Sequence, residues 1–242
     1  MKTAILVDGG FYRKMAKKHF GDKSASERAQ ELVSYCKRHL KQIDSYTKDD
    51  AGNRQFHYSE LYRIFYYDCP PVDKNVFHPL TQKTVNFKSH PTFTWMHTFL
   101  NELKGKRKLA LRLGFLASDA AVFTLSNEVT KKIFNRTLKI EDVQEKDFSL
   151  SMFQKGVDMK IGLDIASLSY KRLVDQIVLI SGDSDFVPAA KLARLEGIDF
   201  ILDPMGHPIN EALQEHIDGL RSYYSAFTQQ KLSSAQSQEP SA

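Results

Sequence analysis

The sequence predicts an α/β protein, a three-layer sandwich in which helices cover both faces of a mostly parallel β-sheet. The first observation is a set of short apolar runs that each lead to an aspartate, at residues 5–8, 64–68, 177–183 and 200–203. These runs are rich in β-branched and aromatic residues without polar alternation, which is typical of strands buried on both faces. The second observation is that helical patterns separate the runs, as crossover connections between parallel strands require.

The helices are expected between these strands and after the last one. Apolar residues recur with helical spacing at residues 11–20, 26–43, 93–103, 157–168, 187–195 and 209–226. The polar segment 46–60 is expected to be a loop before the second strand. Each predicted strand is therefore joined to the next by at least one helix.

The middle of the chain follows a different pattern. Leucines and a phenylalanine alternate with other residues from Leu109 to Phe115, and Phe148, Leu150 and Met152 alternate with serines. This period of two predicts half-exposed strands that pair with each other. Residues 120–134 look helical and residues 135–147 look like a charged loop. We interpret residues 105–155 as a β/α arm inserted against the main sheet.

One domain is expected over residues 1–228, followed by a disordered Ser/Gln-rich tail at residues 229–242. The only cysteines, Cys36 and Cys69, form no CxxC motif, so neither zinc nor a disulfide framework is predicted and a cytoplasmic location is expected. No apolar stretch approaches the length of a membrane span. The formal charge of +5 is compatible with a polyanionic partner. An exposed edge of the arm leaves a homo-oligomer possible.

Aspartates at strand ends are the main candidates for a functional site. The carboxyl ends of parallel strands meet at one edge, so Asp8 and Asp183 can lie close together although they are far apart in sequence. Asp185 follows two residues later, and Asp158 begins a predicted helix. Each acid alone could equally cap a helix or belong to a turn. Together in one cleft they would repel one another, and Mg²⁺ or Mn²⁺ is the expected occupant.

Four segments of the chain together resemble the successive motifs of a known family. They are residues 7–11 (VDGGF), 66–71 (YYDCPP), 155–158 (KGVD) and 181–186 (SGDSDF). In order and spacing they resemble an NYN domain of the bacterial LabA-like branch, within the PIN-like nuclease superfamily. The resemblance extends from residue 3 to about residue 225.

This resemblance implies a Rossmann-like PIN fold, a Mg²⁺ or Mn²⁺ site and cleavage of RNA. It assigns the catalytic and metal-binding roles to four aspartates and a supporting hydrogen bond near the substrate to Ser181. The four aspartates are Asp8, Asp158, Asp183 and Asp185. The chain departs from the pattern at one position, because many relatives have Asp-Gly-x-Asn after the first strand and this chain has Phe11 in place of the asparagine.

Lysines beside Asp158 are the expected contacts to the substrate phosphates. Lys155 and Lys160 flank this aspartate and could neutralise phosphates next to the acidic cleft. The basic groups at residues 13–18 and 104–112 are more typical of solvated faces. His207 is the only histidine expected near the crevice, where a loop role is favoured.

The main functional hypothesis is a Mg²⁺- or Mn²⁺-dependent endoribonuclease that hydrolyses single-stranded or structured RNA. The alternative from another class is a catalytically weak or inactive RNA-binding module of the same fold, which the missing asparagine and the arm favour. A phosphatase of the haloacid dehalogenase type would need a second aspartate two residues after the first, where this chain has Gly10. A dinucleotide-binding enzyme is disfavoured because Gly9-Gly10 lacks the required glycine pattern.

Overall fold

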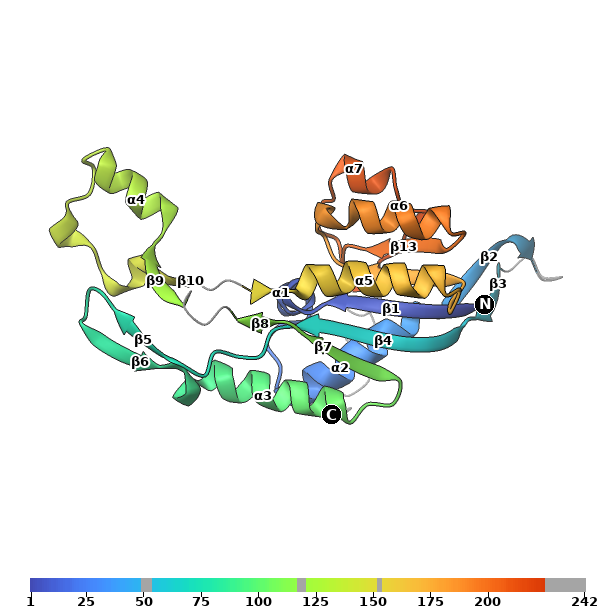
Figure 1. Ribbon diagram of the computed structural model, residues 1–242, viewed down its shortest axis with the longest axis horizontal. Coiled ribbons are helices and arrows are strands. Elements are labelled where there is room, and N and C mark those ends of the chain that lie inside the picture. The colour runs from blue at the N-terminus through green and yellow to red at the C-terminus, as the bar shows by residue number, and fades with distance from the viewer. Residues whose placement is uncertain (49–53, 117–120, 152–153, 225–242) are drawn as a thin grey trace, which may run out of the picture. The chain divides into compact units, whose positions relative to one another are not determined.

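The structure is a computed structural model that describes residues 1–48, 54–116, 121–151 and 154–224 (Figure 1). The chain divides into two compact units. The first comprises Met1–Asp68, Thr98–Leu113 and the chain from Val157 onward. The second comprises Cys69–His97 and Gly114–Gly156. The predicted tail at residues 229–242 lies outside the described residues.

The first unit is built around a six-stranded sheet whose strands all run parallel. Its order is β14-β13-β12-β1-β4-β7. The bounds are β1 Lys2–Asp8, β4 Glu60–Asp68, β7 Leu109–Leu113, β12 Gln176–Ile180, β13 Asp199–Asp203 and β14 Gly219–Leu220. Every residue of β12 is buried, as the uninterrupted apolar run predicted. The predicted α/β class with a parallel sheet is confirmed.

Helices cover both faces of this sheet. They are α1 Gly9–Phe20, α2 Ala25–Arg38, the second half of α3 Pro91–Lys104, α5 Val157–Tyr170, α6 Val187–Leu195 and the short α7 Glu211–Gln214. Figure 1 shows α5 and α6 on the near side of the sheet and α2 behind it. No helix among the described residues is long and apolar enough to cross a membrane.

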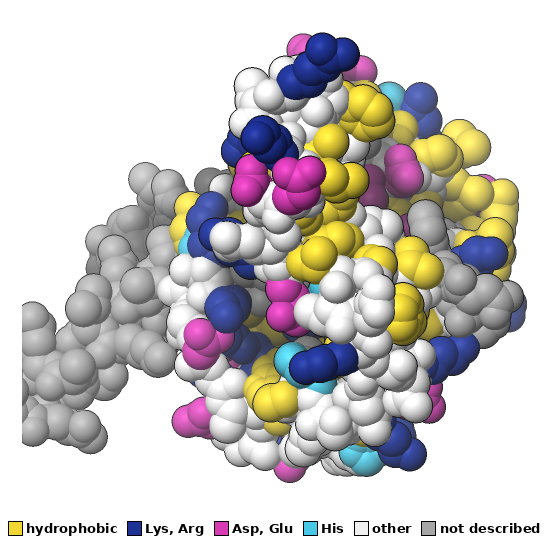
Figure 2. All heavy atoms as spheres, turned by 90° about the vertical axis from the view of Figure 1, so that its left-hand side faces the viewer, with side chains coloured by type: hydrophobic (Ala, Val, Ile, Leu, Met, Phe, Trp, Pro, Cys, Tyr) yellow, Lys and Arg dark blue, Asp and Glu magenta, His cyan; other side chains and the backbone are white. Residues whose placement is uncertain are grey.

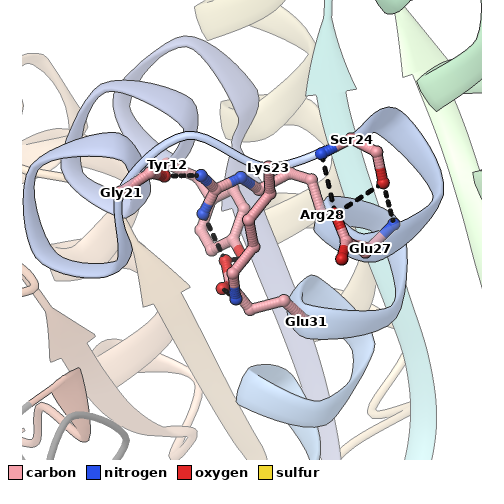
Figure 3. Close-up of polar contacts among 7 residues, drawn as sticks. All are labelled: Tyr12, Gly21, Lys23, Ser24, Glu27, Arg28 and Glu31. Carbon is pink, nitrogen blue, oxygen red and sulfur yellow. Dashed lines mark hydrogen bonds and ion pairs between the residues drawn. The ribbon is translucent and has the colours of Figure 1, made fainter. Parts of the chain in front are cut away.

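The junction between α1 and α2 is held by a polar cluster (Figure 3). Ser24 and Glu27 form a capping box that satisfies backbone N–H groups at the start of α2. The buried carboxylate of Glu31 accepts hydrogen bonds from Arg28 Nη1 at 2.5 Å and Tyr12 Oη at 3.2 Å, and pairs with Lys23. Burying this carboxylate is tolerated because its oxygens are fully engaged by donors. The cluster fixes α1, which begins at the candidate site.

The second unit consists of short antiparallel pairs and short helical segments. Its elements are β5 Asn75–His78, β6 Lys83–Asn86, β8 Phe115–Leu116, β9 Val122–Leu125, α4 Asn127–Phe134, β10 Phe148–Ser151 and β11 Gln154–Lys155, with the first half of α3. β5 pairs with β6, β9 with β10, and β8 with β11. The buried imidazole of His78 packs on the rings of Phe123 and Phe148, at centroid distances of 4.4 and 4.9 Å.

The structure corrects several boundaries predicted from the sequence. Residues 109–113 belong to the main sheet as β7, paired in parallel with β4, so they are not part of an arm over residues 105–155. The predicted pairing of this segment with residues 148–152 was wrong, since β10 pairs with β9. Part of the segment predicted as the helix 120–134 is instead strand β9. Alternation identified the strands, but it carries no information about which strands pair.

Two other segments also differ from the prediction. The predicted loop at 46–60 and the end of the preceding helix contain a hairpin of β2 Lys41–Lys48 and β3 Arg54–Tyr58. Within the predicted helix at 209–226, the described residues form the four-residue helix α7 and then strand β14, and residues 225 and 226 lie outside the described residues. An edge strand of two residues has no periodicity for a sequence analysis to detect.

Candidate active site at the carboxyl ends of the strands

Asp8 is fixed at the end of β1. It is the N-cap of α1, and its Oδ1 accepts a hydrogen bond from the backbone N–H of Phe11 at 3.1 Å. Its Oδ2 accepts one from the Ser181 hydroxyl at 3.2 Å. Ser181 follows β12, the neighbour of β1 in the sheet. Ser181 therefore helps to orient Asp8, and its role toward a substrate stays a prediction.

Asp183 and Asp185 lie in the turn after β12. The Ser181 hydroxyl accepts a hydrogen bond from the backbone N–H of Asp183 at 3.3 Å. Asp183 caps the 3₁₀ helix η4 Ser184–Phe186, and its Oδ1 accepts from the N–H of Asp185 at 3.0 Å. Both side chains are exposed at this edge. Asp185 does not cap the following helix α6, whose N-cap is Phe186 without a side-chain cap hydrogen bond.

The aspartates influence one another electrostatically. The pKa of Asp8 is raised, mainly by burial and further by the charges of Asp158 and Asp183, against the lowering effect of the Phe11 and Ser181 hydrogen bonds. The pKa of Asp158, in the first turn of α5, is raised by desolvation and then by Asp183 and Asp185. The four carboxylates thus form one group of mutually repelling charges. They come from three separate parts of the chain.

These donors match a hard divalent cation in kind, since all are carboxylate oxygens. The spacing of these carboxylates, however, does not form a ready metal site. Among the residues that the structure describes, no three His, Cys, Asp or Glu side chains lie close enough around one point to hold a metal ion. In this geometry an ion would have to draw the carboxylates together.

A pocket of about 310 Å³ opens beside Asp8 and Asp183. It is lined by Asp8, Phe11, Lys14, Met15, Ser181, Gly182, Asp183 and His207. Figure 2 shows one face of the molecule, on which acidic, basic and hydrophobic side chains are interspersed. Sequence reasoning placed Lys14 on a solvated face and gave His207 a loop role, and the pocket brings both next to the acids. His207 had been expected near the crevice from its place after the fourth strand, whereas the basic run that contains Lys14 gave no specific signal.

The two lysines predicted to bind substrate are placed differently from each other. The Nζ of Lys160 donates to the backbone carbonyl of Leu113 at 2.5 Å and so ties α5 to the end of β7. Lys155 is an exposed residue of β11 in the second unit. Neither lysine lines the pocket beside Asp8.

The remaining strand-end aspartates are fully occupied by structural partners. Asp68, at the end of β4, is buried, pairs with the Arg13 guanidinium and accepts from Tyr66 Oη at 2.8 Å. Asp203, at the end of β13, is also buried. It accepts hydrogen bonds from Tyr35 Oη at 2.6 Å, His39 Nε2 at 2.8 Å, Met205 N at 2.8 Å and Ser222 Oγ at 2.5 Å. These two acids therefore stabilise the fold.

The fold and this edge together define an α/β protein with an acidic site at the carboxyl ends of adjacent parallel strands. The chain belongs to the NYN domain family, whose model matches residues 74–218. NYN domains are PIN-like, and nuclease function is inferred for the family as a whole. The matched residues include Asp158, Asp183 and Asp185, whereas Asp8 precedes them.

Two further comparisons describe the neighbours of this chain. No curated protein matches it. Among solved structures it is similar to a protein of unknown function from Vibrio parahaemolyticus RIMD 2210633, with 13% sequence identity, 91% of each chain covered and a TM-score of 0.43.

Proposed function

We propose that this protein is a divalent-metal-dependent endoribonuclease of the LabA-like branch of NYN domains. The observation that carries the proposal is the coupling of Asp8, Asp158 and Asp183 at the carboxyl edge of the sheet, where the charge of Asp183 raises the pKa of both Asp8 and Asp158, and the charge of Asp158 raises the pKa of Asp8. Carboxylates that destabilise one another are retained at a site when a cation or a substrate compensates them.

The chain's own residues have distinct roles in this proposal. Asp8 is oriented through both carboxylate oxygens, by Phe11 N and the Ser181 hydroxyl, so its position is set before any ligand binds. Lys14 lines the same pocket and supplies a positive charge for a phosphate of the RNA. A bound Mg²⁺ or Mn²⁺ would supply Lewis acidity and a water of lowered pKa. Asp158, Asp183 and Asp185 would hold the ion with Asp8.

The test is cleavage of a labelled RNA by the purified protein with Mn²⁺ or Mg²⁺, and with EDTA as the metal-free control. Asp183→Asn keeps the oxygen that caps η4, so the fold is expected to persist while the charge is lost. We expect this variant to cut RNA at least about 100-fold more slowly, in line with the loss of a metal-site residue. Asp22→Asn is the matched control, because Asp22 is 82% exposed and pairs only with exposed Lys17 in the contacts described.

The same variants separate the proposal from its alternative. Mn²⁺ binding, followed by the loss of its free electron-paramagnetic signal on addition of protein, should weaken in Asp183→Asn and stay unchanged in Asp22→Asn. If the wild-type protein binds RNA but does not cut it with either metal, the RNA-binding module is the better description. Equal cleavage by wild type and Asp183→Asn would contradict the assigned site.

A further inference from the structure

We propose that His207 accepts a hydrogen bond from the 2′-hydroxyl of a ribose bound in the pocket beside Asp8, and so makes the site selective for RNA over DNA. This inference rests on the proposed ribonuclease function and adds a specificity-determining residue to it. His207 lines the pocket together with Asp8, Lys14 and Asp183. It comes from the turn after β13.

The tautomer of the neutral His207 ring follows from its neighbour. Its Nδ1 lies 2.6 Å from the carbonyl oxygen of Pro208. A carbonyl oxygen can only accept, so Nδ1 carries the hydrogen in this contact. In the neutral ring Nε2 then holds a lone pair and can only accept. The ring is therefore arranged to receive a hydrogen bond from a ligand, and a phosphate oxygen has no hydrogen to give.

The turn that carries His207 is held in place by several contacts. The N–H of His207 donates to the carbonyl of Pro204 at 2.7 Å, across Met205 and Gly206, which both have positive φ (47° and 74°). Met205 is buried, its N–H binds Asp203, and its carbonyl lies 2.7 Å from His19 Nε2. A residue held this firmly loses little further freedom when a ligand binds, which favours a recognition role.

The ring is also fitted into the wall of the pocket. It meets Phe11 edge to face, with centroids 5.9 Å apart. A Cβ on Gly182 would lie 2.8 Å from Cε2 of Phe11 and would have to displace this ring, whereas at 3.4 Å from Nδ1 of His207 it would make an ordinary van der Waals contact. Phe11 stands where the family resemblance expects asparagine, and here it packs against a polar ring from another part of the chain.

Among the hydrogen-bond donors of a nucleic acid, the 2′-hydroxyl is present in RNA and absent from DNA. The pocket also contains Lys14, which can bind the phosphate of the same nucleotide. A metal-ligand role would also use the Nε2 lone pair. The binding test in EDTA described below separates this role from a contact with the ribose.

The test is binding in EDTA, where no metal-dependent cleavage interferes. Fluorescence anisotropy measures the affinity of wild type, His207→Phe, His207→Ala and Lys14→Met for a single-stranded RNA octamer, the matching DNA and the 2′-fluoro analogue. The 2′-fluoro sugar keeps an RNA-like conformation but has no hydrogen to donate. His216→Phe is the matched control, because His216 lines a different pocket at the amino end of β13.

We expect wild type to bind RNA between about twofold and about tenfold more tightly than DNA or the 2′-fluoro analogue, the range of one neutral hydrogen bond. Both His207 variants should lose this preference by binding RNA more weakly, with DNA affinity unchanged. Lys14→Met should weaken binding to all three and reduce the slope of log affinity against log salt by about 0.7. His216→Phe should behave as wild type.

Other outcomes overturn the inference. If the His207 variants weaken RNA and DNA equally, or change neither, His207 does not read the ribose. If they weaken Mn²⁺ binding while the RNA preference in EDTA persists, His207 is a metal ligand instead. Because binding is measured without metal, the two proposals can fail independently. The protein can fail to cut RNA while its RNA preference still depends on His207, and it can cut RNA while His207 contributes nothing to that preference.

Discussion

The pair of Arg13 and Asp68 tests whether a strand-end aspartate outside the candidate site stabilises the fold. The Asp68 side chain is 1% exposed and the Arg13 side chain 25% exposed. Replacing Arg13 with methionine keeps most of the side-chain volume but removes the guanidinium from the buried Asp68 carboxylate, which lies beside Tyr66. Breaking a buried pair from one side costs about 3–5 kcal/mol. We take the lower end, about 3 kcal/mol, because water reaches Arg13.

The magnitude translates into a measurable shift in unfolding temperature. For a chain of this size, about 3 kcal/mol lowers Tm by about 6–12 °C. Asp68→Asn should cost about 1 kcal/mol, since the remaining guanidinium is partly solvated and the amide can still bind it. The double variant should cost little more than Asp68→Asn alone. The coupling energy of the cycle is then about 2–3 kcal/mol.

The assay is thermal and urea unfolding of the four proteins, followed by far-ultraviolet circular dichroism. Lys17→Met is the control on the same helix, because its pair with Asp22 is exposed on both sides and should contribute less than about 1 kcal/mol. Additive effects of the two single variants would refute the reasoning. So would an Arg13→Met variant as stable as wild type, since Asp68 would then be compensated by something else.

Two other variants test the candidate site by their effect on the stability of the fold. The pKa of Asp8 in the folded protein is raised above 3.8, so its ionisation costs stability that appears as the pH rises above 3.8 and is complete above the raised pKa. Asp8→Asn should therefore unfold at a higher temperature than wild type at pH 7, and the gain should shrink as the pH falls toward 3.8; a gain independent of pH would contradict this. In Gly9→Ala, the new Cβ would lie 2.5 Å from Oδ2 of Asp68 and 2.6 Å from the ring of Tyr66. We expect a loss of about 1–3 kcal/mol by urea unfolding, whereas Gly10→Ala, with only Asp8 Oδ1 nearby at 3.6 Å, should be close to wild type.

The sequence predicted the central sheet well because its strands are buried on both faces. The runs at residues 5–8, 64–68, 177–180 and 200–203 are apolar without alternation, and all four became parallel strands of the main sheet. β7 was assigned to the arm because Leu109–Leu113 alternates, as an edge strand with one half-exposed face does. Pairing partners and short edge strands depend on tertiary contacts that leave no local pattern.

The site was predictable only in part for a related reason. Asp8, Asp158, Asp183 and Asp185 were singled out together, and the structure couples them electrostatically. Asp68 and Asp203 have the same position at strand ends, and nothing in their local sequence shows that Arg13 or Tyr35 and His39 reach them. Likewise, His207 enters the pocket through a turn whose geometry depends on contacts to distant residues.

The topology explains why the aspartates at only two of the four strand ends remain available to bind a ligand. From β1 the chain moves to β4 on one side of the sheet, and from β12 it moves to β13 on the other, so the direction of winding reverses between β1 and β12. At such a reversal the connecting segments leave toward opposite faces and a crevice opens at the carboxyl ends. Asp8 and Asp183 border this crevice. Asp68 and Asp203 end the strands one step outward, where α1 and α2 supply Arg13, Tyr35 and a cap residue, His39, to occupy them. An aspartate at a strand end is thus structural where helices supply side chains that occupy it, as for Asp68 and Asp203. At the reversal, as for Asp8 and Asp183, it has no such partners among the described residues, and the strand order sets this difference.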